Sequence, residues 1–300
     1  MNSRLVTDYL DPAVVSQLDR LDLIARLVVE GFITGLHQSP YHGFSVEFSE
    51  YRQYIPGDPI RNLDWKVWGR TDRLFVKQFE EETNLKAYLV LDSSASMAYG
   101  SAEVTKHRYA TLMSAALGHL MLRQRDAVGL VTFDSQLRSL LPPRSVGSHL
   151  HTLLRSIEDT TPDGSDTDLA DTFHSLAEQI RRRALIIVLS DLLDDTDRVI
   201  DGLKHFRHRN HEVIVFHLLD PREYDLAFDR ETVFVDLETG TRVATEPWQI
   251  ATEYRAEVNA RHEKLQRQCR EAYVDYVQLD TQTPFNVALS NYLAKRKKLL

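Results

Sequence analysis

From residue 85 onward, short apolar runs alternate with segments of helical length, and this alternation limits the possible folds more than any other feature of the chain. Residues 185–189 and 213–216 are apolar at every position. Such continuous runs are typical of strands that helices cover on both faces. Strands that alternate with helices in this way predict an α/β fold: a doubly wound, mostly parallel sheet flanked by helices.

The same pattern predicts the positions of the elements. Strands are expected at 86–91, 127–133, 137–141, 184–190, 212–219 and 274–279, and helices at about 105–124, 148–158, 168–182, 195–208, 247–272 and from 284. Residues 232–245 read as a β-hairpin with a turn at 238–240, inside an insertion at about 221–247.

Upstream of residue 85 the elements are fewer. Helical spacing over residues 12–35 predicts one helix, and short strands are expected at 44–54 and 74–79. We hypothesise that the hairpin pairs with these strands as a small β appendage. The predicted organisation is therefore an N-terminal helix and β segment in residues 1–82, followed by an α/β domain in residues 83–300.

Composition excludes some classes of function. The chain is 43% hydrophobic and 27% charged, as expected of a globular protein, and its net charge of −8 argues against general nucleic-acid binding. Its single cysteine, Cys269, rules out an internal disulfide framework and suits a reducing compartment. The chain begins without a signal-peptide pattern, and no stretch is long enough to cross a bilayer. We expect a soluble cytoplasmic protein.

Oxygen-bearing side chains follow two of the predicted strands. Asp92, Ser94 and Ser96 come directly after the strand at 86–91, and Asp191 follows the strand at 184–190. Thr167 precedes the helix predicted at 168. In a doubly wound sheet these positions meet beyond the carboxyl ends of the strands. The five side chains predict one site for a hard cation, Mg²⁺ first, with Mn²⁺ or Ca²⁺ as alternatives.

The composition of this predicted site suggests how it would act. Three of its five ligands are neutral hydroxyls, so the charge of a divalent ion would be under-compensated if one aspartate acted through water. An ion with residual positive charge and one open position attracts a carboxylate. We therefore expect a protein partner that supplies an Asp or Glu side chain.

The motif DSSAS, the segment around Thr167 and the pair Ser190-Asp191 resemble the metal-ion-dependent adhesion site of von Willebrand factor A domains. Residues 56–82, PGDPIRNLDWKVWGRTDRLFVKQFEEE, resemble the signature of the bacterial family known as domain of unknown function 58, and the ending YVQLDTQTPFNVALSNYLAKR is similar to that family's. The resemblance implies a von Willebrand factor A-like fold and the same five metal ligands. It also implies an adaptor that acts with a MoxR-type AAA+ ATPase in the assembly or maturation of protein complexes. Some members of the family carry membrane helices, which this chain lacks.

Two alternatives to a binding module stay open. A metal-dependent hydrolase would use the same ion and would need a general base, for which Asp166 and Asp168 are the nearby candidates. A structural subunit with a vestigial site is the other. The sequence has no nucleophile elbow and no glycine-rich phosphate loop, so we expect no enzyme activity and no nucleotide binding by this chain.

Three further groups of residues have simpler structural explanations. The upstream charges and tryptophan are expected to form a salt-bridged seam rather than a partner-binding patch (Arg61, Asp64, Trp65, Arg70 and Lys77). His205, His208 and His211 lack a completing ligand for zinc and suit a helix C-terminus. The basic runs 181–183 and 295–298 have the same explanation, although the second could also contact acidic surfaces. Cys269 is expected to be a partly buried structural thiol.

Overall fold

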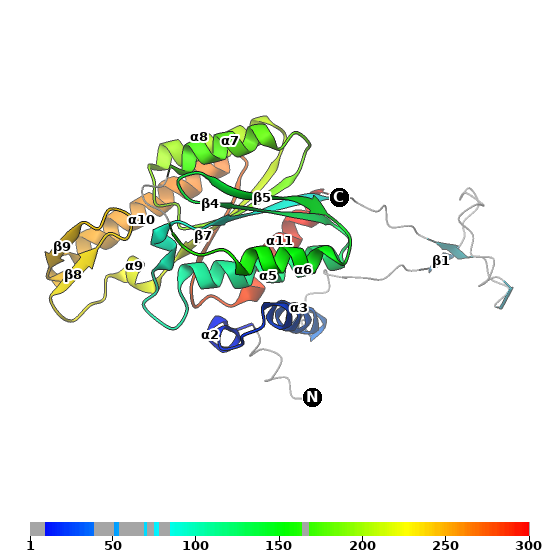
Figure 1. Ribbon diagram of the computed structural model, residues 1–300, viewed down its shortest axis with the longest axis horizontal. Helices are drawn as coiled ribbons and strands as arrows, with labels where there is room; N and C mark the ends of the chain where they lie inside the picture. Colours follow the sequence, from blue (N-terminus) through cyan, green and yellow to red (C-terminus); the bar gives the residue numbers. More distant parts are fainter. Residues whose placement is uncertain are drawn as a thin grey trace.

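The central element of the structure, a computed structural model, is a six-stranded sheet (Figure 1). The structure describes residues 10–38, 51–53, 69–70, 75–77, 85–163 and 168–299. Five strands are parallel and β5 is antiparallel to β4. The strand order is β10 (Asp275–Asp280), β7 (Glu212–Leu219), β6 (Leu185–Ser190), β3 (Lys86–Asp92), β4 (Ala127–Phe133) and β5 (Leu137–Arg144). The predicted α/β fold class is confirmed.

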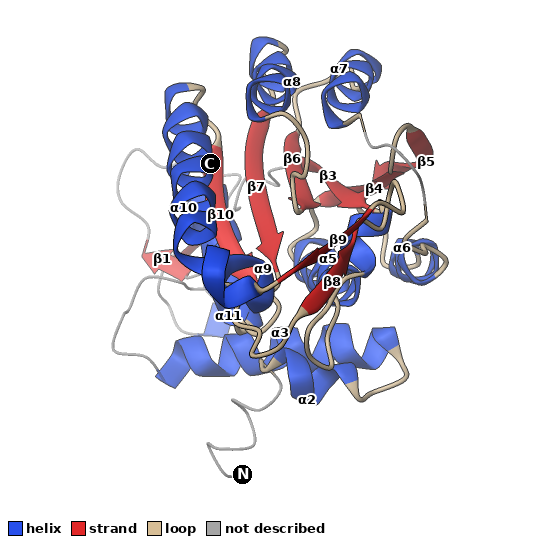
Figure 2. Cartoon of the chain, turned by 90° about the vertical axis from the view of Figure 1, so that its left-hand side faces the viewer, coloured by secondary structure: helices blue, strands red, loops and turns tan. Residues whose placement is uncertain are grey.

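Helices cover both faces of this sheet (Figures 1 and 2). One layer contains α7 (Leu169–Gln179), α8 (Thr196–His208) and α10 (Pro247–Glu271), and the other contains α5 (Lys106–Arg123), α6 (His149–Glu158) and α11 (Phe285–Leu299). The helix α3 (Leu21–Gln38) packs against α5 on the side away from the sheet (Figure 2). Successive side chains of a strand point to opposite faces. Leu89 and Leu91 therefore join the core under α5, whereas Val90 joins the core under α7 and α8. This two-sided burial explains the uninterrupted apolar runs in the sequence.

The chain changes direction across the sheet between β3 and β6. From β3 it proceeds outward to β4 and β5, then returns to β6 on the other side of β3 and continues to β7 and β10. Leu91 of β3 is paired with Leu189 of β6, so the two strands end side by side. The carboxyl ends of adjacent strands at such a reversal are where ligands bind in open α/β sheets.

The single N-terminal helix predicted over residues 12–35 is wrong, because the segment forms two helices, α2 (Pro12–Ser16) and α3. The break keeps Val15 of α2 and Ile24 of α3 fully buried in the core shared with α5. The carbonyl of Leu18, inside the break, accepts a hydrogen bond from the Arg108 guanidinium of α5 (3.3 Å). The domain boundary at residue 82 lies outside the described residues and stays a prediction.

The predicted hairpin is present as β8 (Thr232–Val235) and β9 (Arg242–Thr245), with Gly240 in the turn at φ +71°. Its predicted pairing with the upstream strands is wrong. Within the described ranges β8 and β9 pair only with each other, and β1 (Tyr51–Gln53) pairs with β2 (Phe75–Lys77) in a separate sheet. The hairpin is held instead by the segment after α9 (Pro221–Asp225), where the Phe228 ring contacts the Phe234 ring edge-on.

Among the described residues, no helix is both long enough and apolar enough to cross a bilayer.

Candidate functional site

Asp92 is the last residue of β3 and its carboxylate is buried at the carboxyl end of the sheet. One oxygen, Oδ1, accepts a hydrogen bond from the backbone N–H of Ser94 (2.9 Å). The other, Oδ2, accepts one from the Ser190 hydroxyl at the end of β6 (2.5 Å). Both strands therefore fix the orientation of this carboxylate.

Ser94 and Ser96 lie in the turn that follows β3, at the start of the short 3₁₀ helix η2 (Ala95–Ala98). Their side chains are buried, and their Oγ atoms are 3.0 Å apart. The Ser96 hydroxyl also helps to lower the pKa of the Asp191 carboxyl group. Ser93, between these residues and Asp92, turns the other way and donates its hydroxyl proton to the Phe133 carbonyl (2.8 Å).

Asp191 follows β6 directly and is also buried. Its backbone carbonyl accepts a hydrogen bond from Nε2 of His217 (2.8 Å), a fully enclosed imidazole on β7 whose Nδ1 faces the Tyr276 hydroxyl. The structure therefore brings together Asp92, Ser94, Ser96 and Asp191. The fifth predicted ligand, Thr167, lies outside the described residues, and the N-cap of α7 is Asp168.

Lys106 is a member of this cluster that sequence reasoning missed. It is the first residue of α5 and is fully buried. Its Nζ lies 2.8 Å from Oδ2 of Asp191 and 2.5 Å from Oε1 of Glu223 on α9. A lysine is almost never fully buried without a charged partner. Its place at the start of the helix after the DSSASM turn puts it near the cluster, but this position does not distinguish it from a solvated lysine.

The charges in the cluster shift one another's pKa values. Burial, and then the neighbouring Asp191 carboxylate, raise the pKa of Asp92 to about 7. Burial also acts against ionisation of Asp191, but the Lys106 ammonium outweighs it and holds the pKa of Asp191 below its ordinary value. The pKa of Glu223 is raised, chiefly by burial. Asp191 is thus the carboxylate that Lys106 keeps ionised.

The residues present fit a hard divalent cation. Mg²⁺ binds six oxygens at about 2.1 Å, which places neighbouring ligands about 3.0 Å apart. The Oγ atoms of Ser94 and Ser96 have this separation. Asp92 and Asp191 supply carboxylate oxygens, and the Lys106 ammonium compensates part of the charge of Asp191 and of Glu223. Over the described ranges no cluster of three or more His, Cys, Asp or Glu side chains suits a metal, so the hydroxyls are essential to the donor set.

The structure gives no support to Asp168 as the general base of a hydrolase. Asp168 caps α7 by accepting a hydrogen bond from the Asp171 amide (3.0 Å), and its carboxylate contacts the Arg198 guanidinium at 2.8 Å. Burial by itself would raise the pKa of Asp168, but these hydrogen bonds and the charge of Arg198 outweigh burial, so the pKa lies below its ordinary value. A carboxylate held in its ionised form by an arginine is a weak proton acceptor. Asp166 lies outside the described residues.

The histidines and basic runs have structural contacts. His205 is 2.9 Å from His174 through their Nδ1 atoms, His208 is exposed, and His211 is buried against the backbone of residues 180 and 184. Lys295 contacts two carboxylates, so the run at 295–298 is partly engaged within the molecule. Cys269 is buried and unpaired, and burial raises the pKa of its thiol to about 12. Of the upstream seam, Arg61, Asp64 and Trp65 lie outside the described residues, and that interpretation stays a prediction.

Comparison with known proteins identifies the family to which the chain belongs. The model described as "Protein of unknown function DUF58" matches residues 50–266. An uncharacterized protein of Mycobacterium tuberculosis (strain ATCC 25618 / H37Rv) is 31% identical over 242 residues, which cover 79% of this chain and 75% of that protein.

One solved structure is similar to this chain at the level of the fold. BatB, a conserved hypothetical protein from Bacteroides thetaiotaomicron, has a TM-score of 0.50 at 16% identity over 71% of this chain and 99% of its own. The VWA domain of SpRpn10 has a TM-score of 0.40 at 13% identity and covers 70% of this chain and 95% of its own. The fold is α/β, with a mostly parallel sheet flanked by helices, as the sequence predicted, and it is similar to that of BatB. By its match over residues 50–266 and its mycobacterial relative, the chain belongs to the DUF58 family of proteins of unknown function.

Proposed function

We propose that this chain is a protein-binding module that captures a carboxylate of its partner through a divalent cation. Mg²⁺ is the first candidate, with Mn²⁺ or Ca²⁺ as alternatives. The ligands would be Asp92, Ser94, Ser96, Thr167 and Asp191. The observation that carries the proposal is the 3.0 Å separation of the two serine Oγ atoms beside two buried aspartates at the reversal point of the sheet.

The protein's own residues prepare this site. The Ser94 amide and the Ser190 hydroxyl hold the Asp92 carboxylate in place, and the His217 imidazole holds the backbone of Asp191. Lys106 neutralises part of the negative charge of Asp191. When bound, the ion would supply a positive charge with a position open to an incoming oxygen. Because Lys106 already compensates one carboxylate, that charge would be only partly balanced, which favours an acidic partner group.

The partner class comes from the family resemblance. We propose that the chain acts in the cytoplasm with a MoxR-type AAA+ ATPase as an adaptor for the assembly or maturation of protein complexes. The sequence has no glycine-rich phosphate loop, so ATP hydrolysis would belong to the partner. Among the described residues, the candidate base Asp168 is held by Arg198, which favours a binding role over a hydrolytic one.

Affinity capture tests the metal-dependent docking. The tagged wild-type chain and the Asp92→Ala and Ser93→Ala variants would each be incubated with cell extract in Mg²⁺ or in EDTA, and bound proteins identified by mass spectrometry. Ser93→Ala is the matched control, because the Ser93 hydroxyl contacts Phe133 rather than the cluster. We expect capture by wild type and Ser93→Ala in Mg²⁺ only, and none by Asp92→Ala. Equal capture in EDTA would contradict the metal bridge.

A further inference from the structure

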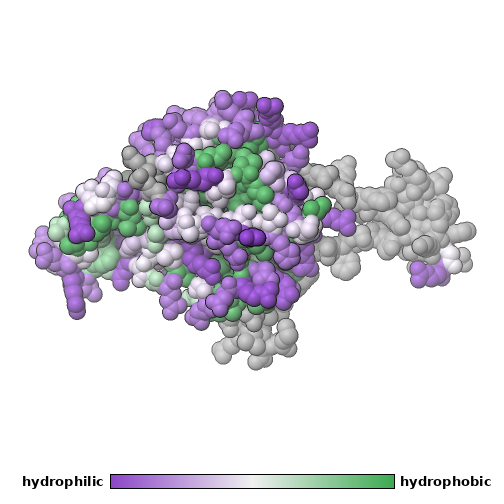
Figure 3. Space-filling model, in the orientation of Figure 1, coloured by the Kyte–Doolittle hydropathy of each residue, from purple (hydrophilic) through white to green (hydrophobic). Residues whose placement is uncertain are grey.

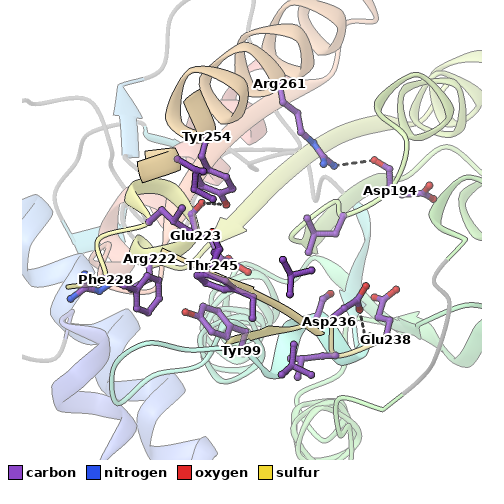
Figure 4. A pocket seen from close by; sticks show the side chains of 18 residues that line it. Tyr99, Asp194, Arg222, Glu223, Phe228, Asp236, Glu238, Thr245, Tyr254 and Arg261 are labelled. Carbon is purple, nitrogen blue, oxygen red and sulfur yellow. Dashed lines mark hydrogen bonds between the residues drawn. The ribbon is translucent and has the colours of Figure 1, made fainter. Parts of the chain in front are cut away.

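A groove of about 660 Å³ opens beside the candidate metal site. Its walls come from the β8–β9 hairpin, α9 with the loop after it, and the beginning of α10, and Figure 4 shows these side chains converging from separate elements. Ser96 and Tyr99, in and just after η2, also line it. The groove is therefore continuous with the site proposed to hold the cation.

The lining of the groove is mainly apolar, and much of it is exposed. Part of the hydrophobic surface lies at the end of the molecule that carries the hairpin, among hydrophilic residues (Figure 3). Five of the hydrophobic lining residues are more than a third exposed (Leu193, Val235, Leu237, Val243 and Ile250). Contiguous exposed apolar surface beside a polar site is typical of an interaction surface. An isolated two-stranded hairpin is also at most marginally stable, so its apolar face needs support.

Hydrogen bonds and ring contacts fix the walls before any partner arrives. The Tyr254 hydroxyl of α10 donates to the Glu223 carbonyl of α9 (2.6 Å). Arg261 donates from α10 to the backbone carbonyls of residues 192 and 194 (2.6 and 2.9 Å). The Phe228–Phe234 ring contact joins the hairpin to the segment after α9. A preformed groove loses little conformational entropy when it binds a ligand.

The charges along the groove define the chemistry of its occupant. Four acidic and two basic side chains line it (Asp194, Glu223, Asp236 and Glu238, with Arg222 and Arg261). Without a cation, this excess of negative charge repels an acidic ligand. Asp236 and Glu238 lie together at one end, away from Arg222 at the other (Figure 4). Backbone hydrogen bonds from Thr239 and Glu238 lower the pKa of Asp236 and keep that end anionic.

We propose that the groove binds an apolar peptide segment of a partner protein, with a basic residue that faces Asp236 and Glu238 and an acidic residue that reaches the cation beside Ser96. The acidic contact rests on the proposed function. The apolar contacts rest only on the groove itself. The hairpin insertion thus selects the partner sequence, and the cation anchors it.

A peptide selection with two hairpin variants tests this proposal. Random dodecapeptides displayed on phage would be selected on the wild-type chain in Mg²⁺, and the enriched peptides synthesised and titrated by fluorescence anisotropy. Val243→Glu places a charge inside the groove. Val233→Glu is its control, since Val233 lies on the same hairpin, is 56% exposed against 57% for Val243, and does not line the groove. Equal melting temperatures of the two variants would show that both fold.

The proposal predicts enriched peptides with apolar residues beside one acidic and one basic residue. We expect their dissociation constants to rise about tenfold or more with Val243→Glu, and to stay within twofold with Val233→Glu. Equal effects of the two variants, or no peptide that binds, would overturn the proposal. Weakening by Val243→Glu but not by EDTA or Asp92→Ala would uphold the groove and refute the metal bridge. If EDTA and Asp92→Ala weakened binding but Val243→Glu did not, the metal bridge would be upheld and the groove refuted.

Discussion

Replacing Lys106 with methionine removes the only positive charge that contacts Asp191 and Glu223 in the described part of the chain, while keeping a side chain of similar length. Because volume is nearly conserved, little of the cost comes from a cavity. It comes from two buried carboxylates that lose their cation. Removing one partner of a buried ion pair typically costs about 3–5 kcal/mol.

The structure indicates the lower end of that range. The Glu223 side chain is 25% exposed and can be partly hydrated, whereas that of Asp191 is 2% exposed and cannot. We therefore expect Lys106→Met to lose about 3 kcal/mol of unfolding free energy in EDTA, mainly through Asp191. For a chain of 300 residues this corresponds to a melting temperature lower by about 5 °C.

Urea denaturation followed by circular dichroism would measure this loss for Lys106→Met, Glu223→Gln and the double variant. Since both residues contact each other, the double variant should be more stable than the sum of the single losses predicts. Mg²⁺ should stabilise Lys106→Met more than wild type, because the ion supplies the missing positive charge. A Lys106→Met protein as stable as wild type in EDTA, or strictly additive losses, would refute this account of the buried lysine.

Three further predictions concern stability measured by urea denaturation. Burial, and then Arg108, lower the pKa of His107 in the folded protein to about 4, so protonation of His107 favours unfolding. The free energy of unfolding therefore falls as the pH drops below about 6.5, the pKa of histidine in the unfolded chain. Between pH 7 and pH 5 the wild type should lose about 2 kcal/mol more than His107→Leu. Gly129→Ala should cost about 1–3 kcal/mol, because a Cβ would lie 2.7 Å from the Leu141 carbonyl oxygen, whereas Gly147→Ala, with nothing within 4 Å, should be neutral. Asp126→Ala should cost about 3 kcal/mol, because it removes the buried carboxylate that Arg296 and the Tyr292 hydroxyl contact.

Parallel pH profiles of wild type and His107→Leu would contradict the first of these predictions. Equal costs at the two glycines would contradict the second. An Asp126→Ala protein within about 1 kcal/mol of wild type would contradict the third.

Local patterns were sufficient to predict the sheet and most of its helices. The apolar run at 185–189 identifies β6 because burial on both faces leaves no polar positions. Asp92 and Asp191 each follow a predicted strand, and ligand sites of doubly wound sheets lie beyond the carboxyl ends of the strands. The structure has both residues at the ends of the adjacent strands β3 and β6. These inferences depend only on residues close in sequence and on general topology.

The missed features depend on contacts between distant segments. Lys106 meets Glu223 across 117 residues, and no local pattern distinguishes it from a solvated lysine at a helix start. The break before α3 is stabilised in part by Arg108, 90 residues away. The partner of the hairpin could not be predicted either, since the alternation in β8 and β9 defines faces but not which segment covers them.

Metal binding by the isolated chain tests the central claim most directly. Mg²⁺ would be titrated calorimetrically into the chelator-treated wild type and into the Asp92→Ala, Ser94→Ala and Ser93→Ala variants. The proposed site predicts one binding event in wild type and Ser93→Ala, with a matching rise in melting temperature, and its loss in Asp92→Ala and Ser94→Ala. Absence of binding to the wild type, with Mn²⁺ and Ca²⁺ equally inert, would contradict the claim, as would unchanged binding to Asp92→Ala.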